Sequence, residues 1–160
     1  MIDQKSNLQQ LAKWIFVLLL LAVTACGSVL PRLPLAVERA NKADQEAHRA
    51  MRDGDLLRAK EMFKQSMLLQ QSLDNTPART VAAINLASVS HKLGDDVVAL
   101  GLLDRILSED VAQISTELRV AAAFRKAIIL ADTNKTEEAE ATLQLASREC
   151  NKQCAFILCV

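Results

Sequence analysis

The sequence predicts an all-α protein in which three helical hairpins stack as a short solenoid after an N-terminal signal peptide. Residues 37–150 hold only three glycines and one proline, and their apolar residues recur three and four positions apart, which is typical of amphipathic helices. Residues that favour turns interrupt this pattern at a 40-residue spacing. A short apolar run also follows two lysines near the N-terminus.

The N-terminal segment has the three parts of a secretory signal. Lys5 and Lys13 form a basic start, and residues 14–23 form an apolar core shorter than the ~20 residues that span a membrane. Thr24-Ala25 then supplies small residues for cleavage, so we expect residues 1–25 to be a signal peptide. An uncleaved anchor is the alternative, because residues 14–30 carry no charge.

The four residues Val23-Thr24-Ala25-Cys26 resemble the lipobox of bacterial lipoproteins. The resemblance implies that Cys26 is acylated and becomes the mature N-terminus, so that its lipid holds the chain at a membrane. In such lipoproteins an aspartate after the cysteine favours the inner membrane. Gly27 occupies this position, which implies the periplasmic face of the outer membrane, although the inner membrane stays open as an alternative. Residues 26–36 are then the lipidated cysteine and a linker with two prolines.

The composition after residue 25 makes nucleic acid an unexpected partner. Removal of the signal leaves 135 residues, of which 17 are basic and 18 acidic, so the formal net charge is about −1. A nucleic-acid surface would need a strong basic excess or a basic stripe. This length suits a single domain.

Five groups of turn-forming residues divide residues 37–150 into six expected helices. At the second group we expect Thr76 to cap the following helix and Pro77 to take its first position. The groups are Asp53-Gly54-Asp55, Asp74-Asn75-Thr76-Pro77, Leu93-Gly94-Asp95, Ser108-Glu109-Asp110 and Asp132-Thr133-Asn134.

Three of these turns are related by a 40-residue repeat, with Gly54, Gly94 and Asn134 at equivalent positions. We expect positive φ at these three residues. Small residues would let paired helices approach, and a larger one would fill the space between hairpins. A six-helix bundle with accidental periodicity is the alternative. The columns that keep this register are Ala43, Ala83 and Ala123; Ala47, Ala87 and Ala127; Ala59, Ala99 and Ala139; and Phe63, Leu103 and Leu143.

A turn residue followed by Ala-x-x-x-(Phe or Leu) resembles the tetratricopeptide repeat family. The matches are Gly54, Ala59 and Phe63; Gly94, Ala99 and Leu103; and Asn134, Ala139 and Leu143. The sequence departs from the family in its period, 40 residues instead of 34, and in lacking the first-helix Trp and Tyr and the closing Pro. The resemblance implies a protein-binding domain over residues 37–150, whose first helices line a concave groove.

Partner-binding residues are therefore expected on the first helix of each unit. Their character changes from polar to apolar along the stack, which suits an extended peptide or a partner helix better than a small metabolite. No nucleophile is paired with a base in the sequence, so we expect no catalytic residues and no cofactor. The candidates are Asp44, His48 and Arg52; Ile84, Ser88, His91 and Lys92; and Phe124 and Ile128.

The last residues, 151–160, form an apolar tail that contains cysteines. In an oxidising compartment Cys150 and Cys154 are a possible disulfide, provided that the last helix ends at Asn151. Together with Cys159 they have the spacing C-x3-C-x4-C without a nearby histidine, so we expect no metal site.

The sequence thus predicts a non-enzymatic, outer-membrane lipoprotein that acts as a scaffold or assembly factor. Its expected partners are an envelope protein or an extended peptide segment, and the membrane through the lipid on Cys26. One alternative is a pilotin-like chaperone of a secretin in a pilus or secretion system, which rests on architecture alone. Another is a redox or metal-binding protein that uses the C-terminal cysteines. Homo-oligomerisation is left open.

Overall fold

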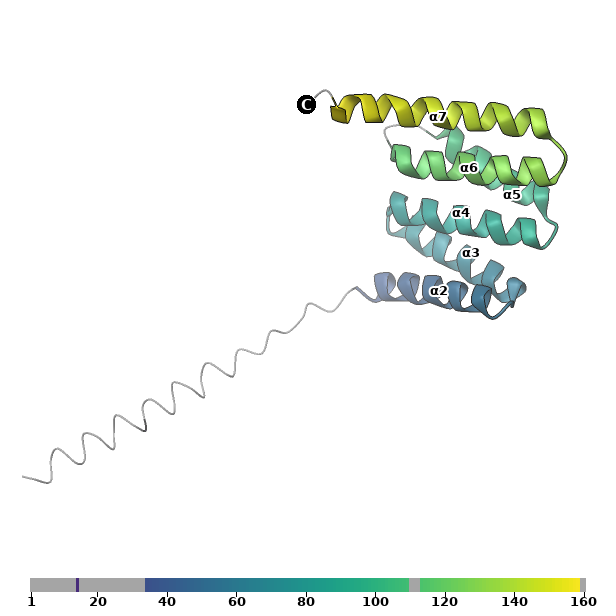
Figure 1. The fold of residues 1–160 in the computed structure, drawn as a ribbon. Helices are drawn as coiled ribbons and strands as arrows, with labels where there is room; N and C mark the ends of the chain where they lie inside the picture. Colours follow the sequence, from purple (N-terminus) through teal and green to yellow (C-terminus); the bar gives the residue numbers. More distant parts are fainter. Residues whose placement is uncertain (1–13, 15–33, 110–112, 159–160) are drawn as a thin grey trace, which may run out of the picture. The chain divides into compact units, whose positions relative to one another are not determined.

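The computed structural model describes Trp14, residues 34–109 and residues 113–158, apart from the side chains of Glu149 and residues 152–158. Within these residues the chain forms six helices and no strand, which confirms the predicted all-α class. Each helix packs against the next one along the chain, and α4 also contacts α6, so the helices form consecutive hairpins (Figure 1). The helices are α2 (Leu35–Arg52), α3 (Leu56–Ser72), α4 (Thr76–Lys92), α5 (Asp96–Ser108), α6 (Thr116–Asp132) and α7 (Thr136–Leu158).

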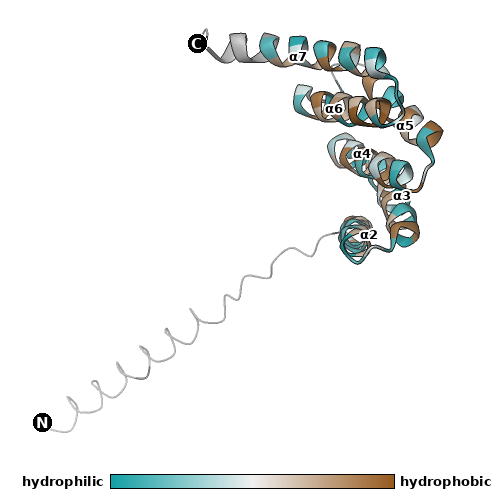
Figure 2. Cartoon of the chain, turned by 45° about the vertical axis from the view of Figure 1, so that its right-hand side comes forward, coloured by the Kyte–Doolittle hydropathy of each residue, from teal (hydrophilic) through white to brown (hydrophobic). Residues whose placement is uncertain are grey.

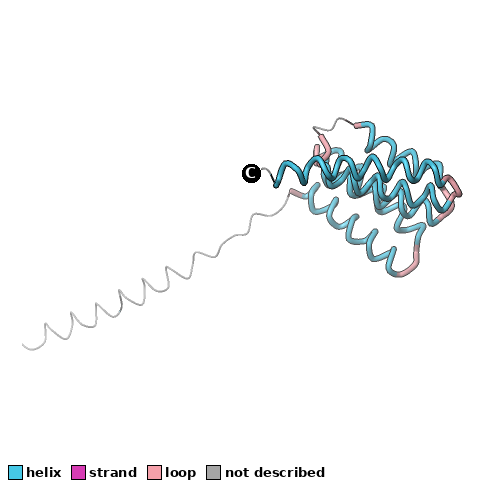
Figure 3. The backbone as a smooth tube through the Cα atoms, turned by 45° about the horizontal axis from the view of Figure 1, so that its top comes forward, coloured by secondary structure: helices cyan, strands magenta, loops and turns pink. Residues whose placement is uncertain are grey.

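Loops connect successive helices (pink in Figure 3). Four of the five connections are three-residue turns with one common geometry. In each turn the middle residue has positive φ, and the next amide donates to the carbonyl five residues earlier, as in a Schellman motif. The positive φ expected at Gly54, Gly94 and Asn134 is confirmed, with values of 78°, 82° and 62°. Asp74 also has positive φ, at 52°, which the sequence did not predict.

The turn at Asp74 corrects the predicted start of α4. Because Asp74 takes the left-handed position, the following Asn75 becomes the cap, and its Oδ1 accepts a hydrogen bond from the Ala78 amide at 3.3 Å. Helix α4 starts at Thr76 and Pro77 is its second residue, so the predicted cap lay one residue too late. Asp55 and Ser115 cap α3 and α6 in the same way.

The longer connection between α5 and α6 is held by a buried arginine. Arg119 of α6 donates hydrogen bonds of 3.1 Å to the carbonyls of Leu107 and Glu109, at the C-terminal end of α5. Arg79 of α4 pairs with the Glu109 carboxylate at 2.6 Å. Ile114, at the other end of the connection, is buried in the core.

Two large apolar clusters hold the hairpins together. Helix α4 brings Leu86 and Val89 to a cluster with Ala47 of α2 and Ala59 and Phe63 of α3. The other cluster joins residues of α4, α5 and α6, so α4 is covered on opposite sides and has nine buried residues. Hydrophilic residues prevail on α2, whereas hydrophobic residues are frequent on α5 and α6 (Figure 2).

Burial follows the 40-residue register at all the alanine columns but changes at the column of large residues. The nine alanines of the three alanine columns are all buried. Phe63 and Leu103 are completely buried, whereas the equivalent Leu143 is 41% exposed. The third hairpin therefore exposes a surface that the first two hairpins cover with a following helix.

Candidate functional site

The predicted partner-binding residues of α2 lie at or near the surface. His48 is exposed and its ring meets the ring of Phe63 edge to face, with centroids 5.0 Å apart. The Asp44 carboxylate lies 3.7 Å from the His48 Nε2 atom, and Arg52 is exposed. These side chains form a polar patch supported by a buried aromatic residue.

Two predicted residues of α4 are not at the surface. Ile84 belongs to the cluster shared with Ala122 and Ile129 of α6, and Ser88 is buried one turn later. The Ser88 hydroxyl donates to the Ile84 carbonyl at 2.9 Å, so its polar group is satisfied within the helix. The expectation that Ile84 and Ser88 line an open groove is corrected, because α6 packs over this face of α4.

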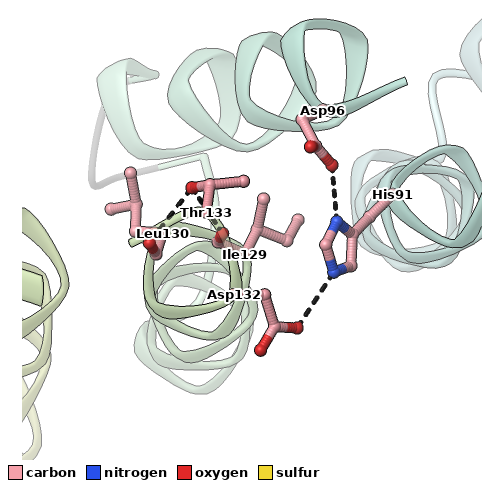
Figure 4. Close-up of polar contacts among 6 residues, drawn as sticks. All are labelled: His91, Asp96, Ile129, Leu130, Asp132 and Thr133. Atoms are coloured by element: carbon pink, nitrogen blue, oxygen red, sulfur yellow. Dashed lines mark hydrogen bonds and ion pairs between the residues drawn. The ribbon is translucent and has the colours of Figure 1, made fainter. Parts of the chain in front are cut away.

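His91, near the end of α4, joins three helices. Its Nδ1 atom lies 2.5 Å from Oδ1 of Asp96 in the first turn of α5, and its Nε2 atom lies 3.0 Å from Oδ2 of Asp132, the last residue of α6 (Figure 4). The imidazole is half-buried, with 23% of its side chain exposed, while its neighbour Lys92 is exposed. This His91 junction therefore ties the second hairpin to the first helix of the third.

The two carboxylates favour the charged form of His91. The hydrogen bond to Asp96 is the main cause that raises the His91 pKa above its usual value, and Asp132 adds to it, while partial burial opposes both. A protonated imidazole donates from both ring nitrogens, so one carboxylate can accept from each. The arrangement suits a charged structural junction, because both nitrogens already have partners.

An apolar groove lies between α6 and α7. It includes two of the predicted residues, Phe124 and Ile128, and its accessible surface is apolar. Phe124 is 56% exposed and Leu143, across the groove on α7, is 41% exposed. The remaining lining residues are Ala127, Ala131, Thr136, Ala139 and Glu140.

Equivalent positions of the three units differ in polarity and exposure. Phe124 and Ile128 follow Ile84 and Ser88 by 40 residues, and these in turn follow Asp44 and His48. This column is polar and partly or fully exposed on α2, buried on α4 and apolar and accessible on α6. The nine predicted residues therefore do not form one continuous groove, and the apolar part is confined to the third hairpin.

The predicted cysteine chemistry depends on a helix end that the structure does not contain. Helix α7 continues through Asn151 to Leu158, so Cys150 and Cys154 share an unbroken helix. Residues four apart on a helix have Cβ atoms about 5–6 Å apart, beyond the ~3.5–4.5 Å of a disulfide. Cys150 has a free and exposed thiol. Cys159, like Cys26, lies outside the described residues.

Two residues that shape the candidate sites, Asp132 and Leu143, were not predicted from the sequence as site residues. Asp132 lies 41 residues after His91, and no local pattern links them. Leu143 was predicted as a residue that fills the space between hairpins, and not as part of a partner-binding surface. Its exposure depends on which helix packs beside it, and no pattern within α7 indicates this.

Few other features of the described residues suggest chemistry. Within them, no group of three or more His, Cys, Asp or Glu residues is placed to hold a metal ion. None of the described helices has the length and apolar character needed to cross a bilayer. No protein-family model, curated protein or solved structure matches this chain.

Proposed function

We propose that this protein is a membrane-anchored scaffold that binds another protein of the bacterial envelope. Its signal would be residues 1–25, and its anchor the lipid on Cys26 at the periplasmic face of the outer membrane. Residues 27–36 would link the lipid to the helical domain. Anchorage would raise the local concentration of the domain at the membrane, so a surface of modest affinity would be enough to recruit a partner.

The proposed domain is a short, tetratricopeptide-like solenoid of three hairpins in a 40-residue register. The left-handed residues Gly54, Gly94 and Asn134 and the buried alanine columns support this reading. Each hairpin would stack on the next through the same face. The proposed role is binding and not catalysis.

The observation that carries the proposal is the exposed apolar groove of the third hairpin. Phe124 and Leu143 remain accessible there, while Ile84 and Leu103, the equivalent residues of the second hairpin, are buried. Exposed apolar clusters of this kind are a common mark of protein-binding surfaces.

The anchor is tested by Cys26→Ala. We expect the variant to lose incorporation of a labelled fatty acid and to leave the membrane fraction. A variant that loses the label but stays in the membrane would show an uncleaved N-terminal helix and would contradict the lipid anchor.

Binding is tested by crosslinking in intact cells, followed by purification under denaturing conditions and identification of the crosslinked proteins. We expect a defined envelope protein to be crosslinked to the wild-type chain. The control is Cys26→Ala, which should lower the yield because the domain is no longer concentrated at the membrane. Absence of any specific crosslinked envelope protein would contradict the scaffold proposal.

A further inference from the structure

The groove between α6 and α7 is the counterpart of two grooves that are filled within the chain. The groove between α2 and α3 holds Leu86 and Val89 of α4, next to Phe63. The groove between α4 and α5 holds Ala122 and Ile129 of α6, in one cluster with Leu103. At the third position Leu143 is 41% exposed and no described helix covers it. Within the described part of the chain, the same packing surface therefore recurs on the third hairpin without a covering helix.

The two helices that fill these grooves share a pattern. Each has a buried alanine followed, seven residues later, by a buried β-branched residue: Ala82 and Val89 on α4, and Ala122 and Ile129 on α6. Residues seven apart lie on the same helix face, two turns from each other. The small residue allows close approach and the branched residue fills the space between the paired helices.

A second copy of this chain cannot extend the stack with its first helix. On α2 the two positions of the pattern are Lys42 and Arg49, and both are exposed. Burying these cations in an apolar groove would be costly, because an unpaired charge loses its hydration. Helix α2 is therefore a polar cap, and only the other end of the domain is open for stacking.

The charge beside the open groove indicates the charge of its occupant. Lys60 of α3 pairs with Asp95. Asp95 lies six positions after Val89, just beyond the end of α4, the helix that fills the groove between α2 and α3. The equivalent of Lys60 in the third hairpin is Glu140, an exposed residue whose apolar atoms line the groove, so that its carboxylate lies beside the groove. A basic residue six positions after the β-branched residue would complement Glu140.

We propose that the α6–α7 groove binds one cationic amphipathic helix of a partner protein. Its binding face carries a small residue, a Val or Ile seven residues later, and a Lys or Arg six residues after that. This inference rests on the proposed scaffold function and specifies the class of its partner. The binding mode is a helix laid in a groove between two helices.

The probe is a synthetic peptide of residues 114–136 of this chain, which contains α6. It has the full pattern, with Ala122, Ile129 and Lys135 at the three positions. We expect the labelled peptide to bind the full-length protein, purified in mild detergent, with a saturable change in fluorescence anisotropy. A peptide of residues 34–56, with Lys42 and Arg49 in place of the apolar residues, should not bind.

Groove variants test the position of the peptide. Phe124→Asp and Leu143→Asp should each weaken peptide binding by at least tenfold. Both variants should still fold, because the replaced side chains are exposed and the buried core is unchanged. Val97→Asp is the matched control, because Val97 is 87% exposed and does not line the groove. Far-ultraviolet circular dichroism establishes that the variants remain helical. Equal loss of binding in Val97→Asp would overturn the assignment.

The contact between Glu140 and the basic residue of the peptide is tested by exchanging their charges. Glu140→Lys should weaken binding of the wild-type peptide several-fold, and the peptide variant Lys135→Glu should restore binding to Glu140→Lys. No restoration would overturn the proposed contact with Glu140.

Three outcomes overturn the inference as a whole, and two of them leave the scaffold function intact. The first is the absence of peptide binding while the in-cell crosslink to an envelope protein persists. The second is a crosslink that Leu143→Asp does not weaken, because the partner then uses another surface. The third is concentration-dependent dimerisation in sedimentation velocity that Leu143→Asp abolishes, because a second copy then occupies the groove. Loss of every specific crosslink in the wild-type chain would instead count against the scaffold function.

Discussion

His91 makes part of the domain's stability depend on pH. Its pKa is raised in the folded state, mainly by the hydrogen bond to Asp96 and also by Asp132, and burial only partly offsets this. A raised pKa means that the folded state binds the proton more tightly than the unfolded state. The stabilisation is therefore complete below the ordinary histidine pKa, about 6.5, and is lost as the pH rises through the folded pKa.

We expect His91→Gln to lower the free energy of unfolding by about 1.5–3 kcal/mol at pH 6, the range for hydrogen bonds to charged groups. The loss should be smaller at pH 8.5, where the imidazole of the wild type is less protonated. Urea denaturation of the wild type and the variant at the two pH values measures both losses of free energy. His48→Gln is the control for removal of a histidine. This variant should keep the pH-dependent stabilisation that His91 provides. An equal loss at both pH values would contradict a charged junction.

Arg119 donates hydrogen bonds to carbonyls at the C-terminal end of α5, where the last carbonyls of a helix have no partner within the helix. Because Arg119 is 7% exposed and donates to the carbonyls of Leu107 and Glu109, removing the guanidinium leaves these acceptors short of a partner. We expect Arg119→Met to lower the free energy of unfolding by about 2–4 kcal/mol, since each unsatisfied buried group costs about 1–3 kcal/mol and these two hydrogen bonds are only partly buried. Arg148→Met on the exposed part of α7 should change it by less than about 0.5 kcal/mol. Chemical denaturation of both variants is the measurement, and similar values for the two would contradict this role of Arg119.

At the scale of the helices and turns, two glycines of one hairpin should respond to alanine with opposite signs. Gly94 has a φ of 82°, whereas Gly101 lies inside α5, and a Cβ atom at either position meets nothing within 4 Å. The effect of each alanine on stability therefore depends only on the backbone conformation at that position. Gly94→Ala should destabilise by about 1–2 kcal/mol, the cost of a left-handed alanine. Gly101→Ala should stabilise by about 0.5–1 kcal/mol, because alanine favours the helix.

Thermal and urea unfolding of the two variants measure this difference. Asp74→Gly provides a further comparison, because Asp74 has a φ of 52° and glycine adopts such a conformation without strain. Destabilisation by Gly101→Ala as large as that by Gly94→Ala would show that packing, and not turn conformation, controls both positions.

The turns and helices could be predicted from the sequence because their signals are local. Gly54, Gly94 and Asn134 favour positive φ by their own chemistry, and the alanine columns repeat with them. The burial of Ile84 and Ser88 could not be predicted in this way, because α6 covers them from about 40 residues away. The His91 junction was missed for the same reason, since Asp132 comes from a later hairpin. Local patterns identify helices and their apolar faces, but they do not say which face a third helix will cover.

At the scale of the whole domain, stability should fall from the middle of the stack toward its ends. Helix α4 packs against α3, α5 and α6 and has nine buried residues. Helix α7 packs mainly against α6, and Leu143 and Leu145 on it remain exposed. In a stack of this kind each helix gains stability only from its neighbours, so a terminal helix opens more easily than a central one.

We expect amide hydrogen exchange, followed by mass spectrometry, to show the slowest exchange in α4 and much faster exchange in α7. The reason is that α4 exchanges only when most of the domain opens, whereas α7 can separate from α6 alone. A helix bound in the α6–α7 groove would cover the free side of α7, so the peptide of residues 114–136 should slow exchange in α7 and leave α4 nearly unchanged. The Leu143→Asp variant is the control, in which the added peptide should have no effect. Exchange in the free protein that is as slow in α7 as in α4 would contradict this gradient, because it would mean that the third hairpin is already covered.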